Sequence, residues 1–248
     1  MVTSIGSLPH RDADAAAAFV LRHQPELPAA PQLPRRSPLE GMVAQAARGI
    51  PGVSISPDGT LSIVDGGIDP SAPVQTPFDG ASHAGLLAFL SLAAGRTDPV
   101  KLQLTGPITL GLALLDAGVP LDQAFEVASA AGATVLSLPV DRDSVLASAA
   151  AINIHLERGG WIAWGAVPTN EPLGTDADRL WRRLSAVWCD LVQSGCDPIQ
   201  LRQQAMVTPA CGLAGHGPSQ AARALKLAQT IAARVTDQAS AIRLSAGA

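Results

Sequence analysis

Short apolar runs of about five residues alternate with longer amphipathic stretches along most of the chain, and this alternation predicts strands and helices in turn. Most of the short runs end in Pro, Gly or Thr, as buried strands do where they meet a loop. The predicted strands are residues 2–7, 29–33, 100–104, 134–138, 161–167 and 205–208. The predicted helices are residues 15–23, 38–48, 81–94, 109–117, 121–131, 144–158, 176–194 and 218–235.

Residues 52–64 follow a different pattern. Apolar and polar residues alternate on both sides of Pro57-Asp58-Gly59, which predicts a β-hairpin. The segment that follows, 65–76, is rich in Gly and Pro and is expected to be a loop.

Strands that alternate with helices indicate a mostly parallel sheet covered by helices. We therefore expect an α/β fold of the TIM-barrel type, a (β/α) barrel. Eight strands close such a barrel, but only six are predicted here. We therefore expect a barrel shortened to about six core strands, with a hairpin insertion near residues 52–64. Residues 1–235 are assigned to this single domain and residues 236–248 to a frayed tail.

Composition excludes several classes of partner. The formal net charge is −4 and no run of Lys or Arg occurs, which argues against binding to nucleic acid or to an anionic membrane. No apolar stretch approaches the ~18 residues needed to span a bilayer, and no secretory signal is visible at the amino terminus. Three cysteines without disulfide-type spacing suit the reducing cytoplasm.

Side chains with useful chemistry follow the carboxyl ends of the predicted strands, where a barrel carries its active site. Cys211 follows the last strand and is a candidate metal ligand or nucleophile, with a small buried apolar residue as the alternative. After the first strand, Gly6 lets a ligand approach the backbone and Ser7 offers a donor and an acceptor. Thr105, after the third strand, is either a ligand contact or part of a tight turn into a helix.

Two arginines stand at the end of the second strand. Arg35 and Arg36 are suited to pairing with a substrate carboxylate, and a solvated loop pair is the alternative for at least one of them. The chain has no Walker loop, no dinucleotide-binding glycine pattern and no zinc-binding helix motif. These residues alone indicate a barrel-like α/β enzyme of unknown substrate.

Five motifs, in order, resemble the cobalamin-independent methionine synthase family of the uroporphyrinogen decarboxylase-like superfamily. They are GSLPH (6–10), PQLPRRS (31–37), KLQLTGPITL (101–110), WIAWGAVPT (161–169) and TPACG (208–212). The resemblance covers most of the chain and implies a (β/α)₈ barrel in the cytoplasm that serves methionine biosynthesis.

The resemblance also implies a chemistry. In that family a zinc ion activates the thiol of homocysteine, which takes a methyl group from a methylated folate. Cys211 matches the family's last zinc ligand, and Ile5, Gly6 and Ser7 match the segment that holds the amino-acid substrate. Glu40 is expected near that substrate.

The chain departs from the family pattern where the other zinc ligands belong. The acidic motif of the fourth strand and the histidine-cysteine motif of the fifth are missing, and Pro139 stands where the sixth strand supplies an acid. Cys211 is thus the one ligand of four that can be matched, and only His10 and His216 remain as further candidates. Because zinc needs three or four protein ligands, we do not expect tight zinc binding.

Three hypotheses follow. The leading one is a methionine synthase-like methyltransferase that acts on a thiol such as homocysteine. It would be either a methyltransferase with an altered mechanism or a degenerate relative of the family. The second is a non-catalytic ligand-binding or partner protein, with a rim at Ser7, Thr105 and Cys211 and a sheet completed in a homodimer. The third is a metal-free decarboxylase-like enzyme that uses Arg35 and Arg36.

Overall fold

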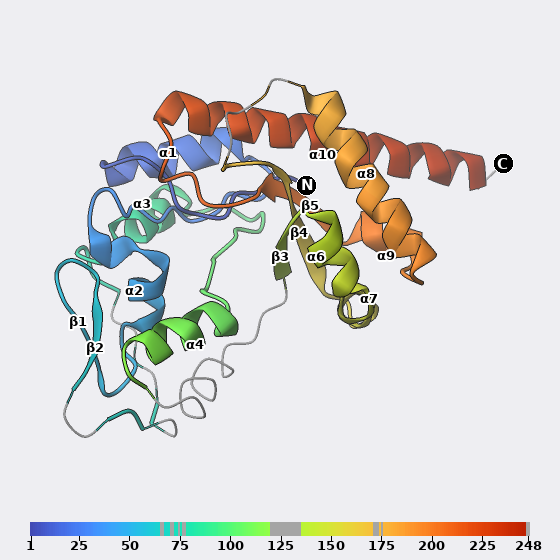
Figure 1. Ribbon diagram of the computed structural model, residues 1–248. Coiled ribbons are helices and arrows are strands. Elements are labelled where there is room, and N and C mark those ends of the chain that lie inside the picture. The colour runs from blue at the N-terminus through green and yellow to red at the C-terminus, as the bar shows by residue number, and fades with distance from the viewer. Residues whose placement is uncertain are drawn as a thin grey trace.

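The computed structural model describes residues 1–64, 67–69, 72–73, 75, 78–119, 135–170, 174 and 176–246 (Figure 1). This part of the chain has a mixed α/β fold with a parallel three-stranded sheet and a separate antiparallel hairpin. The sheet contains β3 (Val135–Pro139), β4 (Trp161–Val167) and β5 (Ala205–Pro209), and the hairpin contains β1 (Val53–Ile55) and β2 (Leu61–Ile63). The helices are α1 (Ala13–His23), α2 (Met42–Ala47), α3 (Ala84–Leu92), α4 (Pro107–Asp116), α6 (Arg142–Ala147), α7 (Ala149–Glu157), α8 (Ala177–Gln193), α9 (Pro198–Gln203) and α10 (Pro218–Ala246), with a 3₁₀ turn, η1, at Pro38–Glu40.

The strand predictions are confirmed for this sheet and for the hairpin. β4 has the predicted ends, while β3 and β5 each continue one residue further than expected. The hairpin pairs Val53 with Ile63, and its turn is closed by Asp58, whose carboxylate accepts a bond from the backbone N–H of Thr60 at 3.0 Å. The predicted helix 121–131 and the predicted strand start at residue 134 lie outside the described residues.

The three amino-terminal strands are less regular than predicted. They are extended segments joined by single parallel bridges, Val2 to Val207, Ser7 to Gln32 and Ala29 to Lys101. Backbone hydrogen bonds support each contact, for example from Leu8 N–H to Gln32 C=O at 2.9 Å. The spatial order is therefore β3, β4, β5, residues 2–7, residues 29–32 and residues 101–104. Within the described ranges no pairing joins residues 101–104 back to β3, so the sheet that is seen is open.

Several helix boundaries differ from the predictions for identifiable reasons. The predicted helix 38–48 is divided at Gly41, which has an extended backbone, into η1 and α2. The predicted helix 144–158 is divided at Ser148 into α6 and α7. α9, which Asp197 caps by accepting bonds from two backbone N–H groups, was not predicted. At the carboxyl end, α10 continues to Ala246, eleven residues beyond the predicted end at Val235.

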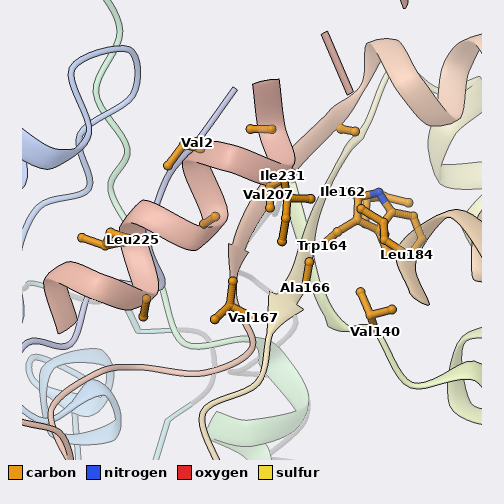
Figure 2. Close-up of a cluster of buried hydrophobic side chains, with 14 of the residues drawn as sticks. Val2, Val140, Ile162, Trp164, Ala166, Val167, Leu184, Val207, Leu225 and Ile231 are labelled. Carbon is orange, nitrogen blue, oxygen red and sulfur yellow. The ribbon is translucent and has the colours of Figure 1, made fainter. Parts of the chain in front are cut away.

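The main core lies between the sheet and the helices α1, α8 and α10. Figure 2 shows Ile231 of α10 beside Val207 of β5, and Leu184 of α8 near Ile162 and Trp164 of β4. All five side chains are at least 99% buried. Removing a leucine-sized side chain from water stabilises a fold by about 1.5–3 kcal/mol, so this layer fixes the outer face of the sheet.

A second, smaller core joins the hairpin to α2 and α4, at lower left in Figure 1. It contains Ala47, Ile50, Leu110 and Leu114. The extended segment between α3 and α4 has apolar side chains in solvent, since Leu102 is 60% exposed and Leu104 is 75% exposed. None of the described helices has both the length and the apolar character needed to cross a bilayer.

Candidate functional site

Two of the predicted site segments meet at one end of the sheet. The backbone N–H of Leu213 donates to the carbonyl of Ser7 at 2.8 Å. A Cβ atom added to Gly212 would lie 2.8 Å from the Cβ of Ser7, so the glycine allows this close approach. Cys211, immediately before it, has an exposed thiol. The segments carrying Ser7 and Cys211 are therefore neighbours, although they are about 200 residues apart in the sequence.

Gly6 is fixed by its contact with Gln103. Its φ of +131° is in the region that favours glycine, and a Cβ atom there would lie 2.2 Å from Nε2 of Gln103. That Nε2 donates to the carbonyl of Ala30 at 2.5 Å. The carbonyl of Ile5 accepts a hydrogen bond from Nζ of Lys101 at 3.2 Å. Ile5 and Gly6 thus contact side chains of the segment 101–104 and join the first strand segment to it.

A cleft of about 240 Å³ opens beside these residues, between α2, α3 and the segments 30–32 and 102–105. Its wall is mostly apolar and includes Met42, Phe78, Leu86, Leu102, Leu104 and Leu110. Five polar side chains also line it, namely Gln32, Gln45, His83, Gln103 and the predicted Thr105. The cleft combines many apolar groups with a few polar groups, as small-molecule sites do.

Most of the polar groups in the cleft are already hydrogen-bonded to one another or to the backbone. Gln32 donates to Gln45 at 2.6 Å, and Gln45 donates to the carbonyl of Ser82 at 2.5 Å. Thr105 donates to the carbonyl of Met42 at 2.6 Å, which accounts for its hydroxyl proton and anchors α2. These bonds hold the wall in one arrangement before any ligand binds.

One acceptor of a residue that lines the cleft has no hydrogen-bond partner among the described residues. The Oε1 atom of Gln103 is buried and has no hydrogen-bond partner in the described structure. A buried amide oxygen without a partner costs about 1–3 kcal/mol. A ligand whose N–H or O–H group displaced the atoms that cover Oε1 could recover that cost by donating to Gln103.

The cleft is electrically neutral. No Asp, Glu, Lys or Arg is among the described residues that line it. Burial lowers the pKa of His83, whose Nδ1 is 2.8 Å from the hydroxyl of Ser82, so the imidazole is uncharged near neutral pH. The described lining residues supply no charge to balance a charged ligand.

Glu40, predicted to lie near a substrate, is placed inside the protein. It is 0% exposed, and its carboxylate accepts bonds from the backbone N–H groups of Leu33 and Gly85, both at 3.3 Å. Arg36 donates to its other oxygen at 2.8 Å. Burial raises the pKa of Glu40, and these donors lower it in part. Glu40 therefore ties the end of the second strand segment to the start of α3.

The two arginines of the decarboxylase hypothesis differ in their contacts. Arg36 is paired with Glu40, while Arg35 is exposed. Neither is among the residues that line the cleft. Among the described residues, the cleft therefore offers no arginine to a substrate carboxylate.

The described residues do not fit a zinc ion. No group of three or more His, Cys, Asp or Glu side chains comes together in this part of the chain. His10 instead packs against Phe19, with ring centroids 4.8 Å apart. Cys211 would thus be a single exposed ligand, and zinc sites use three or four.

Sequence reasoning identified Thr105 but missed Gln32, Gln45, His83 and Gln103. Gln32 and Gln103 lie within the segments PQLPRRS and KLQLTGPITL. A scan of protein-family models finds no match to this chain, and a search of curated proteins finds none that is significant.

Proposed function

We propose that this chain binds a small, neutral, mostly apolar molecule in the cleft between α2, α3 and residues 102–105, on a scaffold derived from a (β/α) barrel. The observation that carries the proposal is the unpartnered Oε1 of Gln103 in an uncharged, largely apolar wall. The volume of about 240 Å³ is below the range of about 300–1,000 Å³ for drug-sized ligands, which favours a compact molecule.

The barrel relationship is supported by the order of the six parallel segments. Consecutive segments 2–7, 29–32 and 101–104 lie side by side, and so do β3, β4 and β5. Chain order matches spatial order in a (β/α) barrel. All three cysteines are free thiols, which supports the cytoplasm as the compartment.

The experiment uses benzamide, which is neutral and carries N–H donors, with benzoate and toluene as analogues. Benzamide should bind in calorimetry, because its amide can donate to Gln103. Toluene lacks the donor and benzoate brings an uncompensated charge, so each should bind at least about tenfold more weakly, or ~1.4 kcal/mol.

Variants locate the binding. Leu86→Trp should fill the cleft and abolish benzamide binding, whereas Leu87→Trp, at an exposed position on the same helix, should leave it unchanged. Equal binding of benzoate and benzamide, or benzamide binding that survives Leu86→Trp, would overturn the proposal.

A second candidate is methyl transfer to a thiol such as homocysteine, as in the methionine synthase-like family. The contact between Ser7 and Gly212, next to Cys211, favours it, because it joins two segments that resemble that family's site. As a methyltransferase, the chain would bind a methylated folate or another methyl donor. The described residues supply no zinc site for it, so we derive no step through the metal.

A further inference from the structure

His83 ends a chain of hydrogen bonds that begins at Asp79, in the turn before α3. Oδ1 of Asp79 accepts bonds from the backbone N–H of Ser82 at 2.9 Å and from the Ser82 hydroxyl at 2.8 Å. The same hydroxyl oxygen lies 2.8 Å from Nδ1 of His83. Two side-chain contacts of ordinary hydrogen-bond length therefore connect a carboxylate to an imidazole that lines the cleft.

Asp79 is ionised, so it can only accept hydrogen bonds. The bonds from Ser82 are the main reason that the pKa of Asp79 is lowered to about 2, and Arg48 lowers it further. Arg48 donates to the other oxygen, Oδ2, at 2.5 Å. Because an ionised carboxylate has no proton to donate, the hydroxyl proton of Ser82 must lie between Ser82 and Asp79.

The direction of this hydroxyl fixes the tautomer of His83. With its proton committed to Asp79, Oγ of Ser82 can only accept from His83, so Nδ1 carries the ring proton. Burial lowers the pKa of His83, so the imidazole is neutral near pH 7 and has one ring proton. Nε2 is then an unprotonated acceptor.

Nε2 is the polar atom that His83 presents to the cleft. His83 is 5% exposed, and the cleft is the cavity that it lines. Nε2 has no hydrogen-bond partner among the described residues, and it is not one of the fully enclosed atoms without a partner, as Nδ1 of His10 is. The ring of Phe78, which also lines the cleft, packs edge-on against the imidazole with centroids 5.1 Å apart.

We propose that Nε2 of His83 accepts a hydrogen bond from the hydroxyl group of a phenol bound in the cleft. This inference rests on the proposed binding of a small neutral molecule there, and it names the class of that molecule. A phenol is uncharged near pH 7, its ring suits the apolar wall and the ring of Phe78, and its O–H is its one donor. Ser82 and Asp79 are positioning residues, because they hold the tautomer that leaves Nε2 free.

The first test reads the tautomer without any ligand. Long-range ¹H–¹⁵N correlation spectra of the ¹⁵N-labelled chain distinguish the two tautomers for each of its five histidines, and the signal missing in His83→Phe identifies His83. In the wild type, Nδ1 of His83 should carry the proton near pH 7. In Ser82→Ala the Nε2–H form should become populated, because the acceptor of the Nδ1 proton is gone. A wild-type His83 protonated at Nε2 would refute the proposal.

The second test compares phenol with anisole, in which a methyl group replaces the hydroxyl proton. Phenol should bind the wild type at least about tenfold more tightly in calorimetry, because anisole cannot donate to Nε2. This preference should be lost in His83→Phe and kept in His23→Phe, whose position on α1 does not line the cleft.

The outcomes separate this proposal from the binding of benzamide. If the wild type binds phenol and anisole equally, His83 is not the acceptor, whatever benzamide does. If phenol is preferred through His83 and benzamide does not bind, the acceptor at His83 stands and the role given to Gln103 fails. If no benzene derivative binds, both proposals fail. The comparison in the wild type holds even if His83→Phe does not fold.

Discussion

The carboxamide of Gln103 fills the space that a side chain at position 6 would need. A Cβ atom on Gly6 would lie 2.2 Å from Nε2 of Gln103, and the backbone there has a φ of +131°. The same carboxamide donates to Ala30, and its oxygen is buried without a partner in a residue that lines the cleft. One close contact therefore fixes the first three strand segments and the proposed ligand acceptor together.

Gly6→Ala should lower the free energy of unfolding by about 2–4 kcal/mol, because it adds both backbone strain and a clash. Gly95→Ala is the matched control, since Gly95 has a φ of +82° and open space around its Cβ position. Denaturant titration should show a loss of only about 1 kcal/mol there. Combining Gly6→Ala with Gln103→Ala should restore part of the lost free energy of unfolding, because the clash is removed. If none is restored, backbone strain alone accounts for the effect.

Much of the fold could be predicted because it is encoded locally. The ends of β4, the Pro57-Asp58-Gly59 turn and the Asp12 cap of α1 each follow from residues within a few positions. The contact between Gly6 and Gln103 spans almost a hundred residues and depends on how the segments pair. Sequence indicated that Gly6 was special but could not say which residue required it.

The role of Glu40 was beyond prediction for a related reason. The resemblance places Glu40 near a substrate, and nothing nearby in the sequence shows that Leu33 and Gly85 will meet its carboxylate. Gly85 is 45 residues away and reaches Glu40 only through tertiary packing. The residues of the cleft were missed because amides such as Gln45 acquire their role from the same packing.

Burial of Glu40 predicts a pH dependence of stability. Its pKa is raised above the ordinary value of 4.5, so above that pH the folded protein binds more protons than the unfolded chain. The free energy of unfolding should therefore fall as pH rises through this window. Glu40→Gln cannot ionise, and its free energy of unfolding should fall less between pH 4.5 and about pH 7. Urea titrations at several pH values measure this, with exposed Glu26→Gln as the control, and parallel curves for wild type and Glu40→Gln would contradict it.

Zinc content separates the two proposed functions. Purified protein should carry well below one zinc per chain by elemental analysis, and Cys211→Ala should not change it, because a single thiol does not hold zinc tightly. Homocysteine should then show no zinc-dependent binding in calorimetry. Stoichiometric zinc that is lost in Cys211→Ala but kept in Cys189→Ala, another exposed thiol, would instead support the methyltransferase.

Among the described residues the sheet has an open edge at 101–104, which predicts self-association. Leu102 and Leu104 are 60% and 75% exposed, and neither has a backbone hydrogen bond with any residue that the structure describes. Such an edge can pair with another strand. Antiparallel pairing of two copies about a two-fold axis would give the backbone N–H and C=O groups of both edges hydrogen-bond partners.

We therefore expect a homodimer in light scattering. Leu104→Lys should convert it to a monomer by placing two charges opposite each other across the axis, and the monomer should remain folded by circular dichroism. Ile199→Lys, at a position on α9 that is 59% exposed, should leave the dimer unchanged. A wild-type monomer at high protein concentration, or a dimer that survives Leu104→Lys, would show that this edge is not the interface.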